Sequence, residues 1–275
     1  MVFVVASSVV SPASAVSRKT GTAELLFQCA HRMGLMPVWI TPNDTIAIHV
    51  DGQERYLNLA RSHFNSESSA ALAKNKYVTR RILERHGIRN IPYMHTDTLA
   101  DAAAFLKRNG TIIAKPMTGF GARDINIITD PLQLEPLHLT TYILEKYIPG
   151  KEMRYLLLND KVIAVHQSEY GVSVAEDREL QRLSYPRQLW SPVLSNLSLR
   201  VTKILDLKFA AVDFLIDSHG QAYVLEVNTV PGFKWFHAPS SGPAVDVARL
   251  FIEAMLDDLR TPAKDTKVKD LLGIS

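Results

Sequence analysis

The stretch VLEVNTVPGF, residues 224–233, constrains the fold more than any other part of the chain. It is an apolar run that carries a carboxylate at Glu226 and an amide at Asn228, and it ends at Pro231-Gly232. Polar groups cost free energy in an apolar strand unless a partner satisfies them. We therefore expect a strand whose polar side chains face a bound metal.

A second strand pattern, AAVDFLID at residues 210–217, precedes this stretch. His219-Gly220 favours a two-residue turn between the two strands, because Gly tolerates a positive φ freely and His better than most residues. In that register Asp213 lies opposite Glu226. Alternation then predicts a core face and a second, polar face. The core face holds Val212, Phe214, Ile216, Tyr223, Leu225 and Val227, and the polar face holds Ala211, Asp213, Val224, Glu226 and Asn228.

The two facing carboxylates predict a cation site. At a separation of about 5 Å, Asp213 and Glu226 repel each other unless a cation lies between them. Two carboxylates and the amide of Asn228 are oxygen ligands, which suit Mg²⁺ rather than zinc. The alternative is a solvated polar face with a slipped register, since exposed Asp and Glu are common.

Residues 112–128, IIAKPMTGFGARDINII, predict a phosphate-binding turn between two strands. Lys115 ends the first apolar strand, and Gly119 and Gly121 bracket the turn. Glycines let backbone N–H groups approach phosphates, and the lysine supplies a compact positive charge. The stretch lacks the G-x-x-x-x-G-K-[ST] pattern of a Walker loop. An ordinary turn is the alternative.

Residues 142–154, YILEKYIPGKEMR, predict a strand that passes into a connection at Pro149-Gly150. Backbone groups exposed at such a connection can hydrogen-bond an adenine edge, and Glu152 follows at a distance suited to a ribose hydroxyl. The alternative is a surface loop with a Glu145-Lys146 pair, which contributes little by itself.

Composition excludes several classes of protein. The 275 residues are 47% hydrophobic and 21% charged, which is enough for a real core in one large or two modest domains. The net charge of +3 is too mild to indicate nucleic acid or a membrane surface as a partner. The single cysteine, Cys29, excludes an intrachain disulfide and fits a reducing compartment, so we expect a cytoplasmic protein. No apolar run approaches the ~18 residues of a membrane span.

The chain begins with MVFVVASSVVSPASA, whose Ala-Ser-Ala could pass for a signal cleavage site. The stretch lacks a basic first region, and Ser and Pro interrupt its apolar core, so we expect a first strand at VFVVAS instead. Residues 1 to about 65 predict a small β-α-β unit with an added hairpin that turns at Asp51-Gly52. Further helices are expected at 22–34, 67–87, 99–110, 195–208 and 243–260, and a further turn at Asn159-Asp160.

Four segments in this order resemble the ATP-grasp superfamily: NKYVTRRILERHGIRNIP, IIAKPMTGFGA, ILEKYIPGKEMR, and FAAVDFLID with AYVLEVNTVPGF. The resemblance covers roughly residues 66–256. D-alanine–D-alanine ligase shares the Glu-x-Asn-x-x-Pro-Gly pattern. The ATP-grasp domains of bifunctional glutathione synthetase and of cyanophycin synthetase are similar in the helical segment and in the Glu-x-Arg of residues 152–154.

The resemblance implies an α+β ATP-grasp fold, in which two α+β subdomains grip ATP, behind a short N-terminal α/β domain. The implied domains are residues 1–65, an ATP-grasp domain over 66–260 and a tail over 261–275. Within the ATP-grasp domain we expect a lid-like subdomain at about 110–146 and a metal-binding subdomain at about 147–260.

The resemblance also implies a role for each motif residue. Lys76 and Lys115 would contact the phosphates of ATP, and the loop from Thr118 through Gly119 and Gly121 to Ala122 would close over them. Glu145, Lys146 and Ile148 would frame the adenine, and Glu152 would hold the ribose. Asp213, Glu226 and Asn228 would bind one or two Mg²⁺, with Mn²⁺ as an alternative. Arg154 would lie near the γ-phosphate or an acyl phosphate, and it and Lys115 are the expected catalytic residues.

The implied activity is that of an ATP-dependent carboxylate–amine ligase that acts on small-molecule substrates through an acyl phosphate. Alternatives are an ATP-grasp enzyme of another kind, such as one that modifies a protein or peptide tail, and a nucleotide-binding protein without turnover. A homodimer is a further expectation. The chain departs from the D-alanine ligases at Ala211, where they carry Arg, and from the glutathione-type domains in HQSEYGVSVAEDRE, so the substrates stay open.

Overall fold

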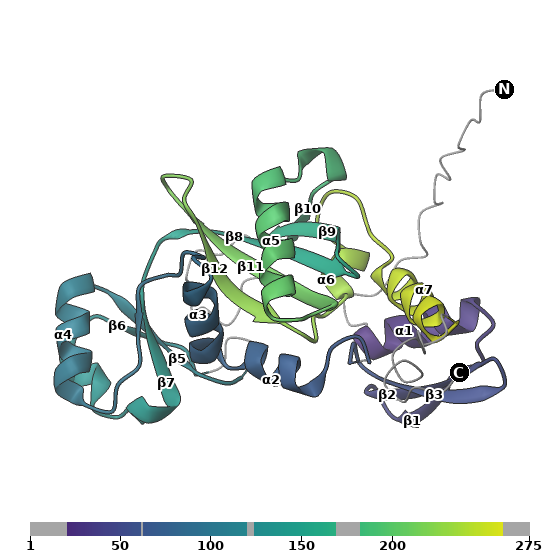
Figure 1. The fold of residues 1–275 in the computed structure, drawn as a ribbon, viewed down its shortest axis with the longest axis horizontal. Helices are drawn as coiled ribbons and strands as arrows, with labels where there is room; N and C mark the ends of the chain where they lie inside the picture. The colour runs from purple at the N-terminus through teal and green to yellow at the C-terminus, as the bar shows by residue number, and fades with distance from the viewer. Residues whose placement is uncertain (1–20, 62, 120–123, 169–181, 261–275) are drawn as a thin grey trace, which may run out of the picture.

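The computed structural model describes residues 21–61, 63–119, 124–168 and 182–260, and the fold is given for these ranges. Three antiparallel sheets follow one another along an elongated molecule (Figure 1). The strand expected at VFVVAS, the site residue Gly121 with its neighbour Ala122, and the tail over 261–275 all lie outside the described residues.

The first unit holds helix α1 (Thr22–Arg32) and the sheet β1-β2-β3. Its strands are β1 (Val38–Thr41), β2 (Thr45–Val50) and β3 (Gln53–Asn58). The predicted turn is confirmed, since Asp51 and Gly52 both have positive φ, at 49° and 77°. Helix α1 packs against the C-terminal helix α7 (Val247–Arg260), and the two share one core with the first sheet.

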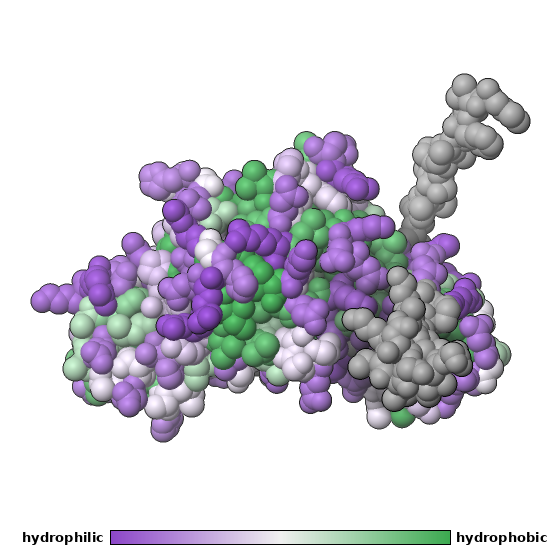
Figure 2. Space-filling model, viewed as in Figure 1, coloured by the Kyte–Doolittle hydropathy of each residue, from purple (hydrophilic) through white to green (hydrophobic). Residues whose placement is uncertain are grey.

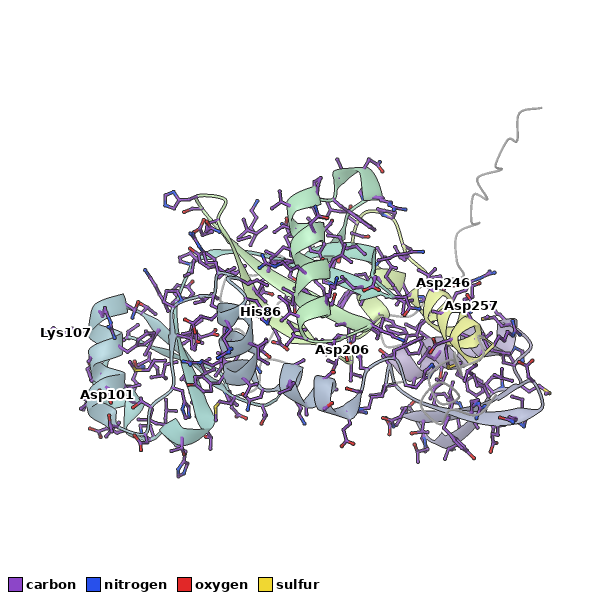
Figure 3. The ribbon with its side chains drawn as sticks, viewed as in Figure 1. His86, Asp101, Lys107, Asp206, Asp246 and Asp257 are labelled. Atoms are coloured by element: carbon purple, nitrogen blue, oxygen red, sulfur yellow. The ribbon has the colours of Figure 1, made fainter. Side chains whose placement is uncertain are left out.

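The sheet at the other end has the strand order β4-β7-β5-β6. Its strands are β4 (Tyr93–Met94), β5 (Ile112–Pro116), β6 (Asn126–Ile128) and β7 (Tyr142–Lys146). Helix α4 (Leu99–Asn109) covers it and joins its core, and short 3₁₀ turns lie at Pro131–Leu134 and Leu139–Thr141. Figure 3 marks α4 by Asp101 and Lys107, at the opposite end of the molecule from Asp246 and Asp257 beside α7.

The central sheet has the order β10-β9-β8-β11-β12. Its strands are β8 (Gly150–Leu158), β9 (Lys161–Ser168), β10 (Arg182–Ser184), β11 (Phe209–Asp217) and β12 (Ala222–Asn228). The turn predicted at Asn159-Asp160 joins β8 to β9, with positive φ at both residues. One face packs on helix α5 (Pro192–Ile204), and the other shares a core with α7 and the short helix α6 (Lys234–His237). A 3₁₀ turn at Arg187–Leu189 precedes α5.

The prediction of a single helix over residues 67–87 is wrong, because the structure has two helices there. Helix α2 (Glu67–Lys74) ends before Asn75, and helix α3 (Lys76–Arg85) begins after it. Asn75 is extended, with φ −87° and ψ 107°, and its side chain accepts a hydrogen bond from the Val78 N–H. An asparagine in that role caps a new helix and ends the preceding one.

Two helix starts also differ from prediction. Helix α5 starts at Pro192 rather than 195, since Ser191 caps it and Pro suits the first turn. Helix α7 starts at Val247 rather than 243.

On the face seen in Figure 2, hydrophobic residues gather near the middle of the molecule, around α5 and above α2. None of the helices in the described ranges combines the length and the apolar character that a bilayer span requires.

Candidate active site

Strands β11 and β12 bring the two predicted metal carboxylates together. Asp213 is the register partner of Glu226, as predicted. The connection is longer than the predicted two-residue turn, because Asp217 accepts hydrogen bonds from the N–H groups of His219 and Gln221 and Ile216 pairs with Ala222. A register shift after Asp213 compensates for the longer turn and restores the opposition of the carboxylates.

The register shift corrects part of the predicted face assignment. Phe214 pairs with Val224, so Leu225 is the extra residue of a bulge. Val224 is fully buried and belongs to the core under α5, although alternation predicted it for the polar face. The bulge lies directly before Glu226, so it sets the direction in which this carboxylate leaves the strand.

Three side chains form a charged row across β8, β11 and β12. Arg154 is the register partner of Asp213 on the side opposite Glu226. Its guanidinium donates to both carboxylate oxygens of Asp213, at 2.6 Å and 2.5 Å. Burial alone would lower the pKa of Arg154, but the Asp213 carboxylate raises it above its usual range. The row therefore consists of the Arg154 guanidinium, the Asp213 carboxylate that it binds, and the second carboxylate, Glu226.

Glu226 is the member of this row whose charge is least favourable. Burial raises its pKa, and the neighbouring Asp213 carboxylate raises it further, against the opposing effect of Lys76 and Arg154. A divalent cation between the two carboxylates would favour the ionised form.

The donor set fits Mg²⁺. The side-chain oxygen of Asn228 accepts the Val230 N–H at 2.9 Å, which orients this amide at the end of β12. In the described part of the chain there is no group of three or more His, Cys, Asp or Glu side chains placed to hold a metal. A cation at Asp213 and Glu226 would thus have two carboxylates, the Asn228 amide oxygen, and water or phosphate oxygens, which is a set that Mg²⁺ accepts.

Lys76 lies at the first residue of α3, next to the glycine turn that follows β5. Its backbone N–H donates to the Met117 carbonyl at 2.8 Å, and its Nζ donates to the Gly119 carbonyl at 3.4 Å. Burial lowers the pKa of Lys76, and the Glu226 carboxylate opposes that effect. Lys76, Gly119, Glu226 and Asn228 line one cavity of about 490 Å³, which extends along α2. The structure therefore brings a predicted phosphate lysine to two of the three predicted metal ligands, Glu226 and Asn228.

Lys115 and Glu145 form a buried cluster with a residue that the sequence analysis missed. Lys115 Nζ donates to one oxygen of Glu145 at 2.8 Å, and Arg80 Nε donates to the other at 2.9 Å. Burial would raise the pKa of Glu145, but Arg80 and Lys115 together lower it to about 2. Arg80 could have been found, because it lies one helical turn after Lys76 and so shares its face.

The remaining predicted site residues lie along the connection from β7 to β8. Lys146 ends β7 and donates its backbone N–H to the Pro92 carbonyl, Ile148 is half-buried, and Glu152 lies near the start of β8. Thr118 is exposed beside Gly119. Among the described residues, those that line the 490 Å³ cavity do not include Lys146, Ile148 or Glu152, so their nucleotide contacts stay predictions.

Comparisons with known sequences agree with these motifs. Residues 138–238 match the family described as D-ala D-ala ligase C-terminus. A D-alanine–D-alanine ligase of Pseudoalteromonas translucida is 26% identical over 200 residues, which cover 66% of this chain and 65% of that protein. The glutathione biosynthesis bifunctional protein GshAB of Listeria innocua is 32% identical over 111 residues, or 35% of this chain and 14% of that protein. The chain thus spans less than two thirds of either relative.

Solved structures agree in fold. The ATP-grasp ligase PsnB, in complex with a minimal precursor, superposes with a TM-score of 0.60 at 20% identity and covers 72% of this chain and 63% of its own. A second structure is the macrocyclase MdnC of Microcystis aeruginosa, bound with the precursor peptide MdnA. It superposes with a TM-score of 0.62 at 14% identity, and the aligned region covers 89% of this chain and 97% of the MdnC chain. The chain therefore has the α+β ATP-grasp fold, and its sequence is similar to those of D-alanine–D-alanine ligases and of GshAB.

Proposed function

We propose that the chain is an ATP-dependent carboxylate–amine ligase that forms an amide or peptide bond through an acyl phosphate. The observation that carries the proposal is the row of Arg154, Asp213 and Glu226, with Lys76 facing the same cavity as Glu226. Two opposed carboxylates beside fixed cations are suited to a metal-bound polyphosphate. No side chain of the row needs to act as a covalent nucleophile.

When bound, ATP supplies the phosphoryl group that activates a carboxylate as an acyl phosphate, and an amine then displaces phosphate. Phosphoryl transfer depends mainly on positioning and on stabilisation of charge. Asp213, Glu226 and Asn228 would hold one or two Mg²⁺ against the phosphates, with Mn²⁺ as an alternative. Lys76 and Lys115 would offset the negative charge on the phosphate oxygens.

Arg154 would act next to Asp213. Its guanidinium is fixed by two hydrogen bonds, so it presents a preorganised positive charge beside the metal ligands. We propose that its remaining N–H groups stabilise the transferring phosphoryl group. Glu145 has its carboxylate bound by Lys115 and Arg80, so the adenine contact proposed for this segment would come from backbone groups of residues 145–148.

The proposal is tested by ADP release. ATP and Mg²⁺ are incubated with amino acids and dipeptides, singly and in pairs, and products are identified by mass spectrometry. Release that needs one pair and yields its condensation mass supports the ligase. Asp213→Asn should abolish release, while Asp97→Asn, an exposed aspartate before α4, should leave it unchanged. ATP binding without release from any pair, including peptides, would contradict a ligase and favour a binding protein.

A second candidate substrate is the side chain or end of a peptide. The observation that favours it is the superposition on MdnC, which was solved with a precursor peptide and of which this chain covers 97%. ADP release that needs a peptide and is absent with every small pair would favour this version of the reaction.

Oligomeric state and location are finer parts of the same proposal. We propose a homodimer through the first sheet, where Val38, Ile40 and Tyr56 are more than half exposed. Light scattering of the full chain and of Ile40→Lys tests it, since a monomer in both would contradict the dimer. We also propose that the protein works in the cytoplasm.

A further inference from the structure

Arg80 is a buried cation that connects helix α3 to strands of two different sheets. It lies on α3, its side chain is 2% exposed, and its acceptors lie on β7 and β12. Few arginines are this deeply buried without a specific set of partners. The partners of Arg80 are therefore the first evidence of what it does.

One side of the guanidinium binds β7, in the sheet β4-β7-β5-β6. Nε and Nη2 both donate to Glu145 Oε1, at 2.9 Å and 2.7 Å. The other oxygen of Glu145 receives Lys115 Nζ at 2.8 Å. Arg80 thus fixes the carboxylate that in turn fixes Lys115, which we propose as a phosphate-binding residue.

The other side of the guanidinium binds β12, in the central sheet. Nη1 donates to the Val224 carbonyl, and Nη2 donates to the Leu225 carbonyl at 2.8 Å. These are the two residues of the bulge that directly precedes Glu226. Bulged residues leave the regular ladder, so their carbonyls need other donors, and Arg80 supplies them.

A purely structural role for this cluster is the competing explanation. A buried ion pair is weak evidence for stability, because apolar residues of similar volume often replace it without loss. The Arg80 cluster differs in that it includes Lys115, through Glu145, and the residue directly before Glu226. Lys115 and Glu226 are both groups of the proposed site. A guanidinium can span these acceptors because its donors form a rigid planar fork, whereas a lysine ammonium cannot.

We propose that Arg80 is a positioning residue that holds the metal ligand Glu226 and the phosphate lysine Lys115 in mutual register across the two sheets. The inference rests on the proposed function only in that the site binds a Mg²⁺-nucleotide. It predicts that the contribution of Mg²⁺ to nucleotide affinity depends on Arg80, although the Arg80 side chain binds neither Glu226 nor Lys115 directly.

Nucleotide titration calorimetry tests the proposal on the full chain. Dissociation constants for ADP and for AMPPNP are measured with Mg²⁺ and with EDTA, and their ratio gives the metal-dependent gain in affinity. In Arg80→Lys we expect the gain to fall about tenfold or more, as for other residues that orient metal ligands. The matched control is Arg81→Lys, the exposed neighbour on α3, which should keep the wild-type gain.

If the role of Arg80 were only structural, Arg80→Lys would lower the melting temperature and leave the metal-dependent gain in affinity unchanged. That result would overturn the proposal. If Arg80→Lys fails to fold, Glu145→Gln tests the other half. This variant keeps the two carbonyl contacts of β12, so the gain should persist while the affinity in EDTA falls. Loss of the gain in Glu145→Gln, with the EDTA affinity unchanged, would contradict the proposed division of roles.

The two proposals fail in different ways. A wild-type chain that shows the metal-dependent gain but makes no product from any substrate pair overturns the ligase and leaves the role of Arg80 standing. A wild-type chain without any metal-dependent gain overturns both.

Discussion

Arg154 donates to both carboxylate oxygens of Asp213 from the neighbouring strand, at 2.6 Å and 2.5 Å. Asp213 therefore has its charge offset by the protein itself, while Glu226, its partner on the other side, has a raised pKa. The two carboxylates consequently differ in function. Arg154 binds Asp213 on one side, whereas Glu226, whose pKa is raised, is the group that gains most from a bound cation.

Replacing Arg154 by Met should leave Asp213 as a buried carboxylate without its cation. Removal of one partner from a buried ion pair typically costs about 3–5 kcal/mol, and Arg154 is partly exposed, so we expect the lower end of that range. Urea unfolding in EDTA measures the loss. Added Mg²⁺ should recover part of it, and Arg85→Met, an exposed change on α3, should show neither effect. Equal stability of Arg154→Met and wild type in EDTA would contradict the assignment.

Replacing Glu226 by Gln should stabilise the metal-free protein at neutral pH. The pKa of Glu226 is raised in the folded state, so the folded protein holds this proton more tightly than the unfolded chain does, and stability falls as pH rises above the unfolded value. Glutamine has no such proton to lose. In EDTA, Glu226→Gln should melt above wild type at pH 8 and close to it at pH 4.

The same variant should lose its response to metal. Mg²⁺ with ADP should raise the melting temperature of wild type and leave that of Glu226→Gln nearly unchanged, because the cation loses a charged ligand. If Glu226→Gln without metal melted below wild type at pH 8, the ionised Glu226 would not destabilise the folded protein, and the prediction would be wrong.

The sequence predicted the parts of the site that depend on short-range pattern. The hairpin at Asp51-Gly52 and the turn at Asn159-Asp160 follow from turn residues, and the structure confirms them. The Asp213–Glu226 opposition is confirmed too, although the connection is longer than predicted and a bulge restores the register. The break at Asn75 was also within reach, because Asn is a favoured helix cap.

Other parts depend on contacts between distant segments. The bulge at Leu225 cannot be read from β12 alone, because the donor that satisfies its carbonyl is Arg80, 145 residues away. The Lys115–Glu145–Arg80 cluster likewise joins three segments whose separation in sequence hides their contact. Local pattern therefore located the residues of the proposed site, and tertiary contacts decide how they are oriented.

The environment of the His237 side chain leads us to expect a loss of stability in mild acid. Its Nε2 accepts the Ala248 N–H at the start of α7, at 3.0 Å, which requires the neutral ring. Burial lowers its pKa and Arg32 adds to this effect, while the Asp246 carboxylate opposes it. A lowered histidine pKa means that the unfolded chain takes up the proton first, so stability should fall as pH drops below about 6.5.

Chemical unfolding between pH 7 and pH 5 measures this slope. His237→Gln should flatten it, while His86→Gln, an exposed change at the end of α3 (Figure 3), should keep the wild-type slope. A wild-type slope in His237→Gln would assign the acid sensitivity to other groups.

The backbone at Gly150, in the connection that leads into the proposed site, has no room for a side chain. It starts β8, and a Cβ built on it would lie 2.4 Å from the Ile216 carbonyl oxygen on β11. Contacts below about 3 Å force the backbone to move, and overpacking of this kind typically costs about 1–3 kcal/mol. Gly150→Ala should therefore lower the free energy of unfolding by about that amount, as measured by urea denaturation.

The same change should also weaken nucleotide binding, because β8 pairs with β11 along its length and carries Glu152 and Arg154 two and four residues after Gly150. A displaced start of β8 moves the proposed ribose contact more than the metal ligands, so ADP affinity in EDTA should fall and the gain from Mg²⁺ should persist. The matched control is Gly21→Ala, where a Cβ meets nothing within 4 Å and φ is −84°. If Gly150→Ala binds ADP as tightly as Gly21→Ala does, the β7–β8 connection does not form part of the nucleotide site.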